Sequence, residues 1–117
     1  MAAPNIVNVT TILGKTAVLA VTTSATAIVT NSAASGKVFK VNALYVSNID
    51  GTNSADITVD IFRSSTAYRI TSTIAVPADA TLDVISKSIY LEEGDALRLT
   101  ASADSDLVAV CSYEEIS

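Results

Sequence analysis

The fold class is decided by residues 38–63, which read VFKVNALYVSNIDGTNSADITVDIFR. In the second half of this stretch Ile57, Val59 and Ile61 fall on every second residue. A period of two places them on one face of a β-strand. The first half alternates less cleanly, because apolar residues of both parities meet around Leu44. A strand that is apolar on both faces is usually covered on both sides, so we expect this half to form a central strand.

The two halves are joined by residues that favour turns. Asn, Asp, Gly and Ser gather in residues 48–56, and these residue types tolerate positive φ or hydrogen-bond their own backbone. Asp50-Gly51 is also a common hairpin sequence, although this loop is longer than a two-residue turn. The sequence therefore predicts that the two strands pair as a hairpin and that most other segments pack against it as further strands.

Short apolar runs separated by turn residues continue along the rest of the chain. We expect Gly14-Lys15 to end a first extended segment, residues 31–36 to form a loop, and Ser64-Ser65 to turn the chain tightly. About eight or nine short strands result, with turn signals about every ten residues. This spacing is typical of an all-β fold, an antiparallel β-sandwich that is jelly-roll-like in form.

The composition argues against several classes of function. Seven Lys and Arg face twelve Asp and Glu, for a net charge of −5, and no basic patch is visible of the kind with which nucleic-acid-binding proteins displace counterions. No apolar run reaches the roughly 20 residues that a membrane-spanning helix needs. The chain has no histidine, which removes the commonest general base and the histidine zinc sites. We therefore expect no nucleic-acid partner, no membrane partner, no cofactor and no enzymatic activity.

Three groups of residues invite a chemical interpretation. Residues 14–16, Gly-Lys-Thr, match the end of a phosphate-binding P-loop, but Val9 stands where that motif needs a glycine. Residues 50–56 offer oxygen ligands for calcium, but their spacing differs from that of an EF-hand, and a hydrogen-bonded turn explains them better. Cys111 is the single cysteine and lies in an alternating run, so we expect a strand residue rather than a reactive thiol.

The amino-terminal segment carries the candidate interaction site. We expect residues 1–13 to form an amino-terminal strand or assembly arm and residues 14–117 to form a single β-sandwich domain. The segment is either the first strand of the same domain or an arm that adds a strand to the open sheet edge of a neighbouring subunit. The apolar residues that would form this subunit-interface arm are Ile6, Val7, Val9, Ile12 and Leu13.

Three stretches carry a resemblance to a known group of proteins. They are LYVSNIDGTNSADITVDIF (residues 44–62), IAVPADATLDVISKSIYLEEGDALRLTAS (74–102) and VAVCSYEEIS (108–117). With these stretches the chain resembles small virion structural proteins of tailed phages that infect cyanobacteria and marine bacteria. The matching residues are turn and strand signals, and the amino-terminal residues 1–37 match less well.

The resemblance implies a non-enzymatic structural protein of the virion, made in the cytoplasm of the host bacterium. We expect a capsid decoration (cement) protein that binds the major capsid protein or other virion proteins and assembles as a homo-oligomer, with a trimer favoured. A neck, tail or fibre component of the same particle is one alternative. A small carbohydrate-binding module is another, but such modules usually present exposed aromatic residues, and the strand pattern predicts that Tyr45 and Tyr68 point inward.

Overall fold

The computed structural model describes residues 4–117, which fold into nine β-strands and contain no helix. The strands are β1 (Ile12–Ala20), β2 (Thr26–Thr30), β3 (Val38–Asn48), β4 (Ala55–Arg63), β5 (Thr66–Val76), β6 (Thr81–Asp83), β7 (Ile89–Leu91), β8 (Ala96–Ala101) and β9 (Leu107–Ile116).

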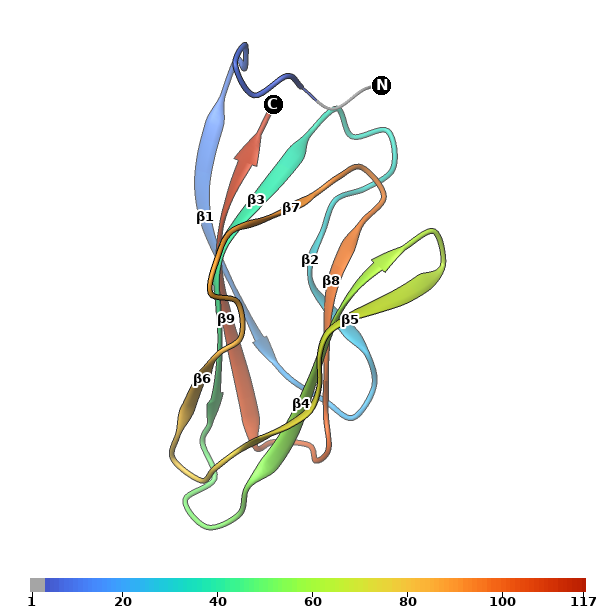
Figure 1. The fold of residues 1–117 in the computed structure, drawn as a ribbon. Coiled ribbons are helices and arrows are strands. Elements are labelled where there is room, and N and C mark those ends of the chain that lie inside the picture. The colour runs from blue at the N-terminus through green and yellow to red at the C-terminus, as the bar shows by residue number, and fades with distance from the viewer. Residues whose placement is uncertain (1–3) are drawn as a thin grey trace.

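The strands form two sheets that pack face to face (Figure 1). One sheet has the order β1-β9-β3-β6, with β7 also paired to β3, and the other has the order β2-β8-β4-β5. All pairings are antiparallel. This order is that of a jelly roll, in which β6 and β7 are two pieces of one interrupted strand beside β3. The prediction of an all-β antiparallel sandwich with eight or nine short strands is confirmed.

The predicted hairpin within residues 38–63 is wrong. β3 and β4 form the two strands of this stretch, but they lie in different sheets, and residues 49–54 carry the chain across one end of the sandwich (Figure 1). This loop is long enough to cross the roughly 10 Å between packed sheets. Turn-forming residues alone do not distinguish a hairpin loop from a loop that crosses between two sheets, because both loops place two strands against one core.

A true hairpin joins β4 to β5. Its turn residues Ser64 and Ser65 have φ angles of 52° and 61°, and positive φ at both central residues is what a type I′ hairpin turn requires. The predicted tight turn at these serines is therefore confirmed. By contrast, the break predicted at Gly14-Lys15 is wrong, because β1 continues through both residues and pairs with β9 along its whole length.

β3 carries apolar side chains at both odd-numbered and even-numbered positions because a β-bulge exchanges which of them point to the core. Its register against β9 shifts between Val41 and Ala43. Val41 is buried before the shift and Leu44 and Val46 are buried after it, while Tyr45 between them is exposed. β3 is a central strand as predicted, since it pairs on both edges. The prediction that both its faces are covered is wrong, because only one face packs on the core.

The core between the sheets is aliphatic. The alternation of Ile57 and Val59 correctly places both in it. Burial of each large apolar side chain contributes about 1.5–3 kcal/mol relative to its exposed state. The apolar residues with 0% of their surface exposed are Val41, Leu44, Val46, Ile57, Val59, Leu91, Leu97, Leu99 and Cys111.

A buried asparagine at the end of β3 fastens the loop that crosses between the sheets. Nδ2 of Asn48 donates to the backbone oxygens of Asn53 and Val76, each at 2.9 Å. Its Oδ1 accepts from the backbone N–H of Asp50 at 2.9 Å. The Asn48 side chain thus satisfies three polar backbone groups, two in the crossing loop and one at the end of β5, where a buried unpaired group would cost free energy.

A second asparagine does the same at the opposite end, where residues 31–37 cross from β2 to β3. Asn31 is fully buried, and its Nδ2 donates to the backbone oxygens of Lys37 at 2.9 Å and Leu91 at 3.1 Å. Its Oδ1 accepts from the hydroxyl of Ser35. The sequence predicts a loop here, correctly, but gives no sign that this asparagine is the residue holding it.

Candidate functional site

The five residues of the predicted arm fall in two parts of the structure. Ile12 and Leu13 begin β1, while Ile6, Val7 and Val9 lie in the preceding segment, which passes over the ends of β9 and β3 (Figure 1). Val9 is half-buried and the other four are exposed, with Val7 at 87%. The predicted domain boundary after residue 13 thus falls inside β1, and a role of this segment as an arm stays a prediction.

The segment is tied to the carboxyl-terminal end of β9 by backbone hydrogen bonds. The N–H groups of Thr10 and Thr11 donate to the carbonyl of Ser117 at 2.8 and 2.9 Å, and the N–H of Ser117 donates to the carbonyl of Thr11 at 3.0 Å. Thr11 and Ser117 therefore form a hydrogen-bonded pair that continues the β1–β9 ladder by one residue beyond the strands. Exposed apolar side chains and a fixed backbone meet at this end of the molecule.

Close to this point a buried carboxylate holds two lysines. Glu115 is buried on β9, and its carboxylate accepts from Nζ of Lys15 on β1 at 2.8 Å and from Nζ of Lys37 in the β2–β3 loop. Hydrogen bonds from both ammonium groups lower the pKa of Glu115, and the same contact raises the pKa of Lys15. Lys15, the one charged residue of β1, thus forms its ion pair within its own subunit.

β1 is also the longest regular edge among the four sheet edges in residues 4–117. Its pairing with β9 runs without a register shift from Ile12–Ile116 to Ala20–Val108. The edge strand β2 is short and irregular, β6 and β7 have three residues each, and β5 has two register shifts against β4. Bulges and short strands are common ways of blocking edge pairing, and β1 has neither.

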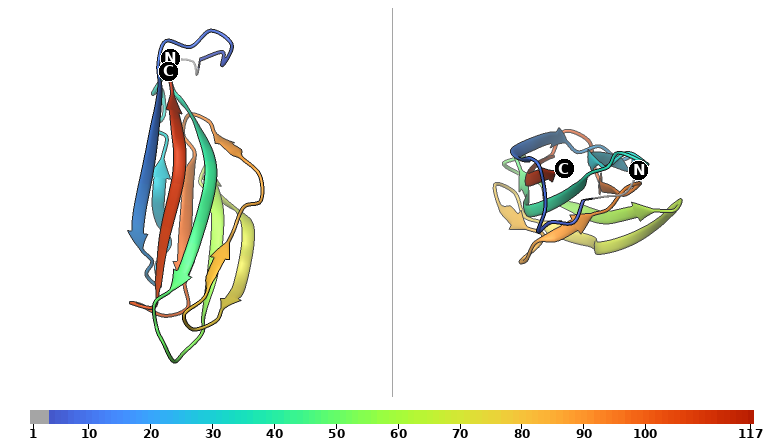
Figure 2. Two further views of the ribbon diagram at one scale, coloured as in Figure 1. Left: turned by 90° about the vertical axis from the view of Figure 1, so that its left-hand side faces the viewer. Right: turned by 90° about the horizontal axis from the view of Figure 1, so that it is seen from above.

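The outer face of the β1-β9-β3-β6 sheet carries exposed apolar side chains. The register places Val18 beside Val110, and Val110 beside Tyr45, so these three form one row across β1, β9 and β3. Val18 is 75% exposed, and the other two are also exposed. In the left view of Figure 2 these strands lie side by side, and no other element covers their outer face.

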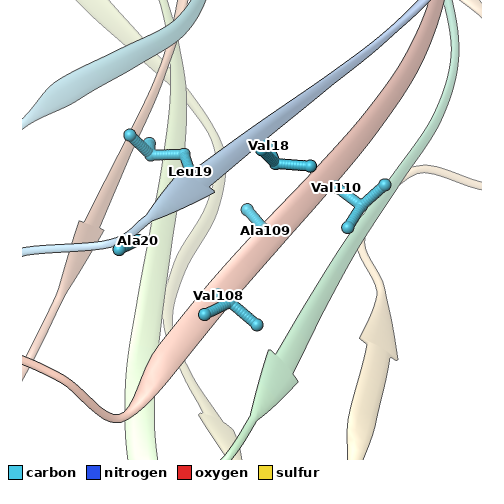
Figure 3. Close-up of a pocket in the computed structure, with 6 residues that line it drawn as sticks. All are labelled: Val18, Leu19, Ala20, Val108, Ala109 and Val110. Carbon is cyan, nitrogen blue, oxygen red and sulfur yellow. The ribbon is translucent and has the colours of Figure 1, made fainter.

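A shallow depression lies on β1 and β9 beside this row. Val18, Val108 and Val110 project on one side of the two strands and Leu19 on the other (Figure 3). Ala20 lies on the same side as the three valines, and its short side chain leaves space beside them, whereas Ala109 faces the core. The sequence interpretation missed this surface, although β9 signals it by apolar residues on both parities, with Val108 and Val110 alternating with Ala109 and Cys111.

The predicted inward orientation is wrong for Tyr45, and Tyr68 is exposed although it lies on the core-facing side of its sheet. Tyr68 is 58% exposed on β5, and Tyr45 and Tyr90 are exposed on β3 and β7. The bulge in β3 moves Tyr45 to the outer face. Tyr68 pairs with Ile61, which packs against the core, but its end of the β4–β5 hairpin projects beyond the opposite sheet and leaves it exposed (Figure 1). Tyr113, by contrast, packs against the core, with its ring centroid 5.6 Å from that of Phe39.

Two further groups of ion-paired residues stabilise the fold. Arg63, at the end of β4, donates from Nε at 2.8 Å to the buried carboxylate of Asp95 and from Nη2 at 2.8 Å to Glu92. The hydrogen bond from Arg63 lowers the pKa of Asp95. On the outer face of the same sheet, Nε of Arg98 donates to Asp60 at 2.9 Å. These pairs fix the β7–β8 turn and neighbouring strands, which is a structural task.

The groups given a chemical interpretation from sequence are likewise structural. Residues 14–16 lie in β1, and the carboxylate of Asp50 accepts from the N–H groups of Thr52 and Asn53, a turn that lowers its pKa. Cys111 is a buried strand residue as predicted, and burial raises the pKa of its thiol to about 11. Within residues 4–117, no three His, Cys, Asp or Glu side chains gather as a metal site would need.

The described part of the chain also has no helix of the length and apolarity that crossing a membrane would require.

Comparison with known proteins gives structural neighbours alone. No family model and no curated protein matches the chain. A chain from Bacillus endospore appendages, described as a novel family of disulfide-linked pili, is 16% identical with a TM-score of 0.53, covering 92% of this chain and 88% of that one. A chain from the acidic stable capsid structure of Helicobacter pylori bacteriophage KHP30 is 7% identical with a TM-score of 0.53, covering 94% and 90%. At these identities the likeness shows a shared fold.

Proposed function

We propose that this protein is a non-enzymatic structural protein of a tailed-phage virion, and more specifically a capsid decoration (cement) protein. The observation that carries the proposal is a jelly roll that exposes a group of apolar side chains on one sheet face and its β1 edge, at Val18, Val110, Tyr45, Ile12 and Leu13. Apolar surface of this kind, rimmed by polar residues, is typical of protein interaction sites. The ion pairs of Glu115, Asp95 and Asp60 stabilise the fold and leave this apolar surface free for contact.

The resemblance of three stretches to phage virion proteins supports the proposal, and so does a structural neighbour from a phage capsid. A decoration protein binds the major capsid protein at many equivalent positions. Each contact is then weak while the assembled lattice is stable, because many copies act together. The expected trimer and the arm at residues 6–13 belong to the same proposal and stay predictions.

The test is the copy number of the protein in purified particles, measured by quantitative mass spectrometry against the major capsid protein. A decoration role on the whole shell predicts about one third to one copy per capsid subunit, which is the stoichiometry of lattice sites. A ratio near a hundredth would assign the protein to the neck, tail or fibre and overturn the decoration role. Complete absence from virions would overturn the virion role as well.

The exposed tyrosines favour one second candidate, a carbohydrate-binding module. Tyr45 and Tyr90 are exposed on the strands β3 and β7 of one sheet, and sandwiches commonly bind glycans through exposed aromatic residues. A glycan array probed with the native protein and with Tyr45→Ala tests this candidate. Binding that disappears in the variant would support it, and an array without signal would remove it.

A further inference from the structure

We propose that two copies of this chain pair through β1, antiparallel and in one defined register, so that the two β1-β9-β3-β6 sheets join into one continuous sheet. This inference concerns the isolated protein and goes beyond the proposed virion role. It rests on the hydrogen-bonding edge of β1, on a self-complementary pattern of side chains, and on the depression beside Val18.

The backbone groups at the open edge of β1 follow from its pairing with β9. Thr11 exchanges hydrogen bonds with Ser117, and the N–H of Val21 donates to Leu107. In an antiparallel ladder the residues alternate between those that bond to one neighbour and those that bond to the other. Odd-numbered residues of β1 therefore bond to β9, and the even-numbered residues direct their N–H and C=O groups to the open edge. These residues are Ile12, Gly14, Thr16, Val18 and Ala20.

A two-fold axis through Thr16 uses all of these groups. It pairs Thr16 with the same residue of the second copy, Gly14 with Val18, and Ile12 with Ala20, and each pairing occurs twice except the central one. Each hydrogen-bonded pair exchanges two bonds, so the contact adds about ten backbone hydrogen bonds. The nine residues of β1 overlap completely in this register.

The side chains agree with the same register. The bulky and highly exposed Val18 faces a glycine, where an added Cβ would meet nothing within 4 Å. On the inner face the exposed Leu13 faces Leu19, and Lys15 faces Ala17 rather than another lysine. A two-fold axis through Lys15 would place like charges directly opposite, which is destabilising. An axis through Ala17 would place Ile12 opposite Thr22, which lies beyond the end of β1.

The depression on β1 and β9 identifies the partner as a second copy. It lies beside Ala20 at one end of β1, and the exposed side chain of Ile12 lies at the other end. The two-fold axis between them brings Ile12 of each copy opposite Ala20 of the other, on the outer face and next to Val18 and Val108 (Figure 3). One strand thus carries both the apolar side chain and the hollow that receives it, which is the requirement for an isologous contact.

Single-cysteine variants test this register directly. Facing residues of a hydrogen-bonded antiparallel pair have their Cα atoms about 5.5 Å apart, within the range of a disulfide. Thr16→Cys is therefore expected to form a disulfide dimer under mild oxidation. Val18→Cys is the matched control, because its two copies lie about 13 Å apart along the strands, and it should cross-link only when mixed with Gly14→Cys. Native Cys111 is buried and does not compete.

A second experiment measures the mass in solution by analytical ultracentrifugation at protein concentrations up to about 1 mM. At this concentration a dimer with a dissociation constant of about 1 mM is still detected. The native chain is expected at twice its 12.1 kDa mass, and not at the three times that mass that the trimer favoured by the resemblance would show. Thr16→Pro removes an N–H from the open edge without removing one from the β9 ladder, so it should be monomeric, while Thr16→Ala should remain dimeric.

A native monomer at the highest concentration would overturn the inference, and so would a Thr16→Cys variant that stays reduced. If Thr16→Pro does not fold, as shown by circular dichroism, the cysteine variants still decide. An oligomer that tolerates a folded Thr16→Pro but dissociates when residues 1–11 are deleted would assign the contact to the amino-terminal arm instead. None of these outcomes depends on whether the protein is found in virions, so the two proposals fail separately.

Discussion

Replacing Asn48 by alanine should destabilise the fold by about 3 kcal/mol. The side chain makes three hydrogen bonds, to Asn53, Val76 and Asp50. The two bonds in the crossing loop contribute about 0.5–1 kcal/mol each, because water can replace the lost partner there. The Val76 oxygen lies at a buried position, and the loss of its donor costs about 1–3 kcal/mol.

Urea unfolding followed by far-UV circular dichroism measures this change, and a thermal scan should show a melting temperature lower by about 12 °C for a domain of this size. Asn42→Ala is the matched control on the same strand. Its exposed side chain makes weaker contacts, 3.3 Å to Glu114 and 3.4 Å to Ser88, so we expect a change within about 0.5 kcal/mol. A loss below about 1 kcal/mol for Asn48→Ala, or equal losses for both variants, would refute the assignment of Asn48 as the fastener of the crossing loop.

Three further predictions concern separate parts of the fold. Replacing Ser64-Ser65 by Asn-Gly should raise the free energy of unfolding by about 1 kcal/mol, since Asn and Gly tolerate the positive φ of a type I′ turn better, and unchanged stability would contradict this. The pKa of Glu115 is lowered in the folded state, so the ionised carboxylate stabilises the protein above about pH 4.5, the usual pKa of a glutamate, and this stabilisation is lost as the pH falls. The difference in the free energy of unfolding between the native protein and Glu115→Gln should therefore shrink on acidification. A difference that stays constant with pH would speak against the lysine contacts. Cys111 should react with a thiol reagent only after unfolding, because it is buried with a raised pKa, and fast labelling of the native protein would show an opening of the core.

The sequence predicts where the strands lie better than it predicts which strands pair with one another. The strict alternation of Ile57 and Val59 identifies a core strand, because a regular strand keeps one parity along its length. The same argument fails at Tyr45, because a single inserted residue exchanges the two faces. Tyr68 has the parity of a core residue but lies where the β4–β5 hairpin projects beyond the opposite sheet (Figure 1). The bulge in β3 has no sequence signal of its own, since Asn42 resembles any polar strand residue.

The pairing of β3 with β9 rather than β4 is a property of the whole chain. Turn residues such as Asp50-Gly51 fix a local bend, but whether the next strand joins the same sheet depends on where every other strand finds its neighbours. The contact surface was missed for a related reason. The exposed row of Val18 and Val110 comes from two segments almost at opposite ends of the chain, and their proximity exists only once the first and last strands are paired.

The unequal edges of the two sheets limit how far this molecule can grow by strand pairing. Extension into a fibre needs two compatible edges on every subunit, whereas β2, β5 and the interrupted strand β6/β7 are all short or irregular. Each subunit therefore has one edge, β1, that can pair with another subunit, and this edge is no longer open once one partner has bound. Many copies of such a domain can therefore lie close together on a surface without their sheets joining into a cross-β aggregate.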